Sequence, residues 1–171
     1  MKHLLFFSFF FLSTSIISAQ NDAISRFFNK YAEDERFTTV FISPKLFQMV
    51  AKIAVDDPEW EQYREVIKDL GGLRILSSDS ISNSMTLYQE IFKKLPNKEY
   101  EELLTVRDGE EHVRFMIRET DQIISELLLL VASPSDFTMI SFMGKINLEK
   151  ISSLAKSMDI DGIEHLEKIK N

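Results

Sequence analysis

Apolar residues recur at the spacing of an α-helix in several separate stretches of the chain. The first stretch covers residues 24–31, where apolar side chains fall at i, i+3, i+4 and i+7 and Asp22 precedes them as a cap. Ser43 and Pro44 form the hydroxyl and proline pair that opens a second helix. Helices are predicted over 22–31, 43–54, 58–70, 80–95 and 148–158, with a short final one from Asp161.

Two of these helices carry further local signals. Gly71-Gly72 follows the third helix and is predicted to end it, because glycine adopts the left-handed conformation without a steric penalty. The fourth helix, over 80–95, is predicted to turn one apolar face inward. That face consists of Ile81, Met85, Tyr88, Phe92 and Leu95.

Segments rich in β-branched and aromatic residues predict strands. Residues 36–42 and 73–77 are two such segments, and from Glu101 the apolar pattern changes from helical to alternating. Four strands follow at short intervals, over 101–107, 112–119, 122–132 and 136–143. The last two are apolar on both sides of the pleat, which is typical of central strands covered on both faces. The pattern predicts an α+β fold with a mixed or antiparallel sheet of about six strands and helices packed on it. Its C-terminal half is a four-strand meander followed by helices.

The strands at 101–107 and 112–119 form a hairpin whose register the side chains specify. A four-residue loop over 108–111 joins apolar residues on one face, pairing Arg107 with His112, Val106 with Val113 and Leu104 with Phe115. On the other face it pairs Thr105 with Arg114, Leu103 with Met116 and Glu101 with Arg118. A two-residue Asp-Gly turn would instead place Glu102 opposite Phe115. Because a slip by one residue reverses both faces, the pattern favours the longer loop.

The first nineteen residues have the order of a secretory signal peptide. Lys2 precedes an apolar run over 4–12, and hydroxyl-bearing and small residues follow up to Ala19. Cleavage after Ala19 would leave a single α+β domain over 20–171. The run is shorter than the roughly 20 residues of a membrane span. We therefore expect an exported protein, periplasmic or secreted, with no stable membrane span after signal removal; an uncleaved membrane anchor is the alternative.

The charge and the absence of cysteine restrict which partners and which reactions we expect. The chain has 20 Lys and Arg against 27 Asp and Glu, a formal net charge of −7. This negative charge argues against binding to nucleic acid, because such binding depends on a cationic surface that releases counterions. It also argues against binding to anionic lipid. Cysteine is absent, which excludes disulfides, thiolate nucleophiles and cysteine-based metal sites.

Familiar catalytic and ligand-binding motifs are missing from the sequence. The acidic stretches Asp56–Glu61 and Asp159–Glu164 lack the residue spacing of a calcium loop. His112 and His165 are far apart, and there is no Gly-x-Ser-x-Gly turn or glycine-rich phosphate loop. We therefore predict no catalytic, cofactor-binding or metal-binding residues.

Several short segments, in their order along the chain, resemble one protein family. They are Ile24–Tyr31, Val40–Lys45, Leu70–Leu76, Tyr100–Leu104 and Phe142–Lys145 with the Leu/Ile helix after it. Together, over roughly residues 24–158, they resemble the exported bacterial proteins grouped as domain of unknown function 4252 (DUF4252). The resemblance implies an envelope protein, offers no catalytic residues to carry over, and suggests envelope regulation as one role.

These observations favour a non-enzymatic binding or interaction module of the bacterial cell envelope. Its expected partner is an unknown envelope protein or an apolar ligand, bound on the sheet face opposite the main helices. The candidate interaction surface there consists of Leu103, Arg114, Met116 and Arg118. Two alternatives stay open. In the first, the remaining helices cover that face instead; in the second, the protein is an exported hydrolase whose site is not visible in the sequence.

Overall fold

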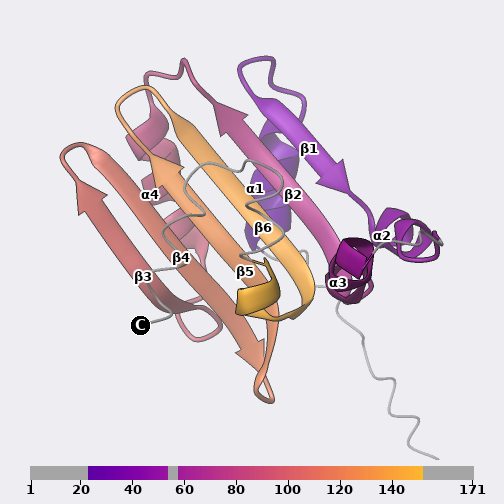
Figure 1. The fold of residues 1–171 in the computed structure, drawn as a ribbon. Coiled ribbons are helices and arrows are strands. Elements are labelled where there is room, and N and C mark those ends of the chain that lie inside the picture. Colours follow the sequence, from indigo (N-terminus) through magenta and orange to yellow (C-terminus); the bar gives the residue numbers. More distant parts are fainter. Residues whose placement is uncertain (1–22, 54–57, 152–171) are drawn as a thin grey trace, which may run out of the picture.

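Helices dominate the first half of the chain and strands the second (Figure 1). The structure is a computed structural model that describes residues 23–53 and 58–151. In chain order the elements are α1 (Ala23–Tyr31), β1 (Thr38–Ile42), α2 (Pro44–Val50), α3 (Pro58–Ile67), β2 (Leu70–Ser78), α4 (Ser84–Lys94), β3 (Glu101–Asp108), β4 (Glu111–Thr120), β5 (Ile123–Ala132) and β6 (Phe137–Ile146). Residues 148–151 begin the helix predicted after β6. The predicted signal peptide, Asp56-Asp57, the rest of that helix and the segment from Asp161 lie outside the described residues.

The strands form one antiparallel sheet in the order β1-β2-β6-β5-β4-β3. Strands β3 to β6 are the predicted four-strand meander, so the α+β expectation is confirmed, and the sheet is antiparallel rather than mixed. β6 is the last strand in the sequence, but it lies inside the sheet between β2 and β5. It therefore joins the β1–β2 pair to the meander.

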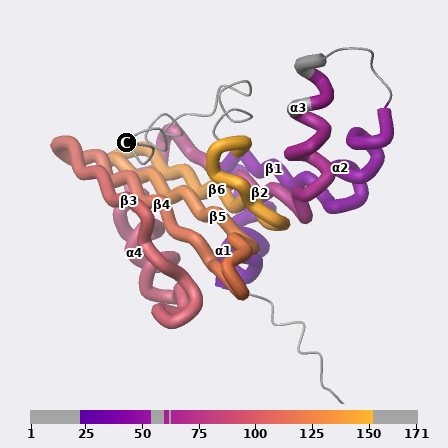
Figure 2. Tube along the Cα trace, turned by 60° about the horizontal axis from the view of Figure 1, so that its bottom comes forward, coloured from indigo at the N-terminus to yellow at the C-terminus, as the bar shows by residue number. Residues whose placement is uncertain are grey.

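Each face of the sheet has its own hydrophobic core. Helices α1 and α4 cover one face, here called the α1/α4 face (Figure 2). The opposite face, here called the α3 face, packs against α2, α3 and Ile151. Alternate residues of β5 pack into the two cores. Leu128 and Leu130 pack on the α1/α4 face, and Leu127 and Leu129 pack on the α3 face. All four are at most 2% exposed, which explains why this strand is apolar on both sides.

The β3–β4 hairpin confirms the predicted register up to Leu104. Val106 pairs with Val113, Leu104 with Phe115, Thr105 with Arg114 and Arg107 with His112. The strands extend one residue further than predicted, because Asp108 pairs with Glu111 and only Gly109-Glu110 forms the turn, with Gly109 at a φ of 57°. Beyond Leu104 the prediction is wrong. Leu103 is a β-bulge, so Glu102 pairs with Met116 and Glu101 with Ile117.

Gly71-Gly72 does not end α3, which stops at Ile67, but lies inside β2. The reason is a close backbone approach between the start of β2 and the end of β6. A Cβ atom on Gly144 would lie 2.2 Å from the Asp69 carbonyl oxygen, and Gly144 has a φ of 132°. The Lys145 amide donates to the same carbonyl at 2.9 Å. The glycines thus allow two strands to cross closely.

The inward face of α4 differs from the prediction. The helix begins at Ser84 rather than Ser80, and its buried residues are Ser84, Leu87, Tyr88 and Ile91, followed by Leu95. Phe92, predicted to face inward, is 37% exposed. The helix carries apolar residues on two adjacent stripes, so the spacing alone left the choice of stripe open. No helix in the described part of the chain is long and apolar enough to cross a membrane.

Candidate binding surface

The four residues predicted as an interaction surface do not form one open surface. Arg114, Met116 and Arg118 lie on β4, on the α1/α4 face, where Met116 is 5% exposed. The Arg114 guanidinium carbon lies 4.0 Å from the ring centre of Phe92 on α4. Leu103, displaced by the bulge, packs against the core of the opposite face. Of the two arrangements left open by the sequence, the covered one is present here.

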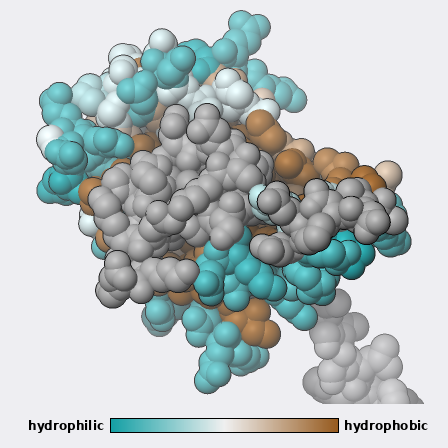
Figure 3. Space-filling view, in the orientation of Figure 1, coloured by the Kyte–Doolittle hydropathy of each residue, from teal (hydrophilic) through white to brown (hydrophobic). Residues whose placement is uncertain are grey.

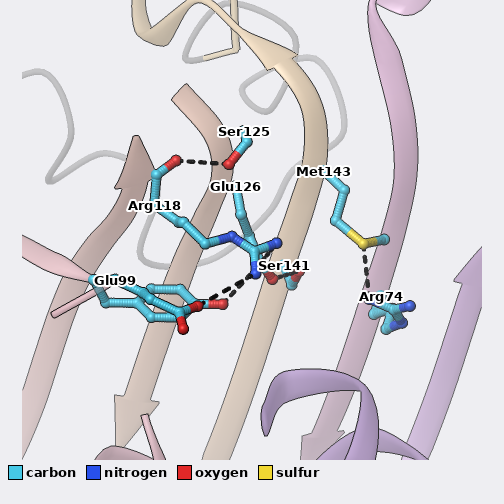
Figure 4. A network of polar contacts seen from close by, with 8 residues as sticks. Arg74, Glu99, Arg118, Ser125, Glu126, Ser141 and Met143 are labelled. Atoms are coloured by element: carbon cyan, nitrogen blue, oxygen red, sulfur yellow. Dashed lines mark hydrogen bonds and ion pairs between the residues drawn. The ribbon is translucent and has the colours of Figure 1, made fainter. Parts of the chain in front are cut away.

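Arg118 instead belongs to a polar network inside the sheet (Figure 4). Its guanidinium lies 3.0 Å from the carboxylate of Glu126, which is fully buried. That carboxylate also accepts hydrogen bonds from the Tyr100 hydroxyl at 2.7 Å and the Ser141 hydroxyl at 2.6 Å. A buried carboxylate needs such partners, because an unpaired charge in the interior is strongly unfavourable. The network ties the segment before β3 to β4, β5 and β6.

Within residues 23–53 and 58–151, the opposite edge strand of the sheet, β1, is paired on one side alone. It pairs there with β2, in a regular register from Thr38–Ser77 to Ile42–Leu73. Its five residues, Thr-Thr-Val-Phe-Ile, are β-branched or aromatic and uncharged. Phe41 contacts Phe28 of α1, with ring centres 6.4 Å apart, yet is 56% exposed.

Helix α2 lies beyond the end of β1, as Figures 1 and 2 show. Ser43 caps the helix by accepting a hydrogen bond from the Leu46 amide, and Pro44 occupies its first turn. Phe47 and Val50 face the core, whereas Leu46, Met49 and the following Ile53 are 46%, 56% and 51% exposed.

We call Phe41, Leu46, Met49 and Ile53 the edge surface. Figure 3 shows hydrophobic residues on this side of the molecule. Sequence reasoning did not identify these residues, although a signal was present. Residues 46–53 are apolar on more than one side of the helix, and a helix of that kind has a second surface to bury.

Three basic residues lie on or beside the elements that carry the edge surface. From Phe37 to Ile53 the chain has no acidic residue, while Lys45 and Lys52 are exposed. Arg74 of β2 lies beneath Phe41, with its guanidinium carbon 5.9 Å from the ring centre, and donates to the sulfur of Met143 at 2.7 Å. The surface is therefore apolar with a positive border, in a protein whose net charge is negative.

Ion pairs of Glu90 and of Asp34 lie beside the chain that leads into β1. Glu90 of α4 binds Lys30 at 2.8 Å and Lys94 at 2.6 Å, and it accepts a hydrogen bond from the Tyr31 hydroxyl at 3.0 Å. The hydrogen bonds from the two lysines lower the pKa of Glu90 to about 2. In the next turn, hydrogen bonds from Arg36 lower the pKa of Asp34 to about 2. Both contacts fix the end of α1, on which Phe41 packs through Phe28.

A cavity of about 390 Å³ lies between α3, the β4–β5 turn and the end of β6. Its charged lining residues are Glu65, Asp69, Glu119, Lys145 and Lys150. In residues 23–53 and 58–151, no group of three or more His, Asp or Glu side chains is placed to hold a metal ion. His112 packs edge-on against the ring of Tyr88, with centres 5.8 Å apart. Within the described residues, the edge surface thus remains the strongest candidate site.

Comparison with known proteins bears on the family. A family model described as "Domain of unknown function (DUF4252)" matches residues 31–154, which is most of the chain. The match confirms the resemblance inferred from the order of the motifs. Searches of the curated proteins and of the solved structures found no match.

Proposed function

The chain belongs to the DUF4252 family, and we propose that it is an exported, non-enzymatic binding module of the bacterial cell envelope that contacts another protein through the edge surface. One observation carries this proposal. Four large hydrophobic side chains, Phe41 of β1 and Leu46, Met49 and Ile53 of α2 and the residues after it, are each between 46% and 56% exposed. They come from two consecutive elements, and within the described residues β1 pairs with another strand on one side alone. Exposed apolar residues concentrated in one part of a protein are typical of an interaction site.

The physical argument rests on what a partner would bury. Apolar surface removed from water contributes roughly 25 cal/mol per Å², and the outward side of β1 has backbone donors and acceptors that a partner can pair. Two other large apolar residues of the described chain, Phe92 and Ile123, are also exposed, but they lie on α4 and at the start of β5. The edge surface contains the other four exposed large apolar residues of the described chain.

Export and envelope location are supported by the charge and apolar order of residues 1–19. Regulation of the envelope is one role for such a module. Mass spectrometry of the protein isolated from its own cells tests export directly. A chain that begins at Gln20 is expected, and a full-length chain retained in the membrane fraction would contradict it.

The binding experiment compares partner recovery by two matched surface variants. The tagged protein is cross-linked in its own envelope and purified, as wild type, as Leu46→Glu/Met49→Glu, and as Ile123→Glu. Both variants place acids at exposed apolar positions, so circular dichroism should show native folding for each. Recovery of the partner is expected to fall at least tenfold in the double variant alone. Equal recovery by all three proteins would rule out the edge surface.

The alternative of an exported hydrolase has its own test. Purified wild-type protein would be assayed against esters, peptides and glycosides, and no turnover is expected. Turnover that one side-chain substitution abolishes, with the fold intact, would overturn the non-enzymatic proposal.

A further inference from the structure

We propose that the partner presents an extended segment that pairs with β1 and places a glutamate over Phe41 against Arg74. This inference rests on the proposed function and adds the form and the charge of the partner. It follows from the backbone of β1, the environment of Arg74 and the charges around the edge surface.

The backbone of β1 favours an extended occupant. An added strand forms main-chain hydrogen bonds with an open sheet edge, while its alternate side chains contact the two faces. β1 has the properties that this requires, because its register with β2 has no shift and it has no charge or proline. Side chains of the added strand on the α3 face would meet the apolar residues of α2. Those on the α1/α4 face would meet Phe41.

Arg74 differs from the other half-buried arginines of the described chain. Arg64, Arg114 and Arg118 each form an ion pair with a carboxylate, at 2.5, 3.1 and 3.0 Å. Within the described residues, no carboxylate lies at ion-pair distance from Arg74, whose hydrogen bond goes to the thioether of Met143. A thioether is a weak acceptor. The guanidinium therefore retains most of its capacity to bind a carboxylate.

The distance between strands selects the longer acid. Neighbouring strands lie about 4.8 Å apart, so a strand added outside β1 runs about 10 Å from β2. The Arg74 guanidinium carbon lies 5.9 Å from the ring centre of Phe41, the residue of β1 with which Arg74 pairs. An arginine and a glutamate together span this gap above Phe41, whereas an aspartate is one methylene shorter. The paired guanidinium and carboxylate would form a charge-assisted hydrogen bond on an apolar support.

Charge also separates this occupant from a second copy of the chain. A β1–β1 contact would bring together two segments that contain Lys45 and Lys52 and no acid between Phe37 and Ile53. Like charges across an interface disfavour it. An acidic extended segment instead complements the positive border.

The experiment uses a phage-displayed library of random nine-residue peptides, selected on the immobilised full-length mature protein. Wild type, Arg74→Gln and Arg107→Gln are compared, because Arg107 is an exposed arginine on the opposite edge strand, β3. Wild type and Arg107→Gln should enrich peptides with alternating apolar residues and one glutamate. Arg74→Gln should enrich similar peptides without the acid. A chosen glutamate peptide should lose about tenfold in affinity on Arg74→Gln, and its glutamine analogue should lose little.

The outcomes separate this inference from the proposed function. Enrichment without acid preference, or an acid preference that survives Arg74→Gln, would overturn the role of Arg74 and leave the edge surface as a binding site. No enrichment of extended peptides would overturn strand pairing with β1, while the envelope cross-linking experiment decides separately whether the edge surface binds a protein. A dimer in solution that Leu46→Glu/Met49→Glu dissolves would identify a second copy as the occupant and overturn the inference.

Discussion

The two edge strands of the sheet differ in almost every property that governs pairing with another chain. β3 carries four charges in eight residues, has a bulge at Leu103, and bears Glu102, which lies 3.1 Å from Arg114. β1 has no charge, no bulge, and exposed apolar neighbours. Charges and bulges are the common means by which proteins prevent unwanted strand addition at an edge.

The contrast shows that protection was not applied uniformly to one sheet. Both edge strands lie at the border of the same sheet. If both needed only protection against strand addition, we would expect charges or a bulge in each of them. The bulge in β3 also takes Leu103 out of the regular ladder and packs it against the α3-face core. One edge strand, β3, is protected against strand addition and the other, β1, is not. This difference agrees with the proposed docking at β1. The following four predictions test this contrast.

The largest expected effect on stability concerns the buried ion pair between Arg118 and Glu126, near β3. Arg118→Met removes the cation beside the fully buried Glu126 and leaves that carboxylate without its charge partner. We expect a loss of about 3 kcal/mol in the free energy of unfolding, measured by urea titration. In the double variant Arg118→Met/Glu126→Gln, the amide carbonyl accepts from one of the two hydroxyls of Tyr100 and Ser141 and the amide nitrogen donates to the other, so most of the loss should be recovered. A loss below about 1 kcal/mol in the single variant would show that the pair is not needed.

The second prediction removes the protection of the β3 edge. Deleting Leu103 should restore a regular ladder, because Glu102 already pairs with Met116 and Leu104 with Phe115. The deletion should cost about 2 kcal/mol of stability through lost apolar contact. It should also promote concentration-dependent association, measured by analytical ultracentrifugation. Leu103→Ala keeps the bulge and should stay monodisperse to the same degree as wild type; association of both variants would contradict the role of the bulge.

The third prediction concerns pH and the support of the β1 side. Hydrogen bonds from Lys30 and Lys94 lower the pKa of Glu90 to about 2 from its ordinary value of 4.5. Its contribution to stability is therefore present above pH 4.5 and is lost as the pH falls toward 2. Because the pair is partly exposed to solvent, we expect only about 1 kcal/mol. Glu90→Gln should lower stability at pH 7 by that amount and converge with wild type near pH 2; parallel stability curves across this range would contradict it.

The smallest effect on stability is expected at Phe41. Phe41→Ala removes contacts with Phe28 and Arg74, but the side chain is already 56% exposed, so the loss should stay below about 1 kcal/mol. Partner recovery should fall strongly at the same time. A variant that loses stability but keeps its partner would make Phe41 part of the core rather than of the docking site.

Local patterns in the sequence predicted much of the fold. Alternation of apolar residues determined the strands, and the pairing of Val106 with Val113 determined the hairpin register. The spacing of side chains could not predict the bulge at Leu103. The bulge packs Leu103 against the core of the α3 face, and that core is built from residues distant in the sequence. In the same way, the Gly71-Gly72 pair is explained by Gly144, which is distant in the sequence.

The candidate site was less predictable than the fold. Arg118 was placed on a surface because an alternating strand shows a basic residue at that position, whereas its partner Glu126 comes from the next strand and is buried by packing. The exposure of Leu46 and Met49 depends on where α2 lies beyond the end of β1. Neither the burial of one group nor the exposure of the other is a property of local sequence.

The interior position of β6 determines when this protein can finish folding. Strand pairs such as Ile75 with Ile140 join residues that are distant in the chain, whereas the meander strands β3, β4 and β5 pair with their neighbours. Distant pairings form slowly, because a long loop must close before they contribute. The β1–β2 pair and strands β3 to β5 are therefore joined into one sheet only when β6, residues 137–146, pairs with both β2 and β5. A destabilised β6 should therefore separate the β1–β2 pair from the rest of the sheet, so the single sheet depends on its one strand that bridges the two parts.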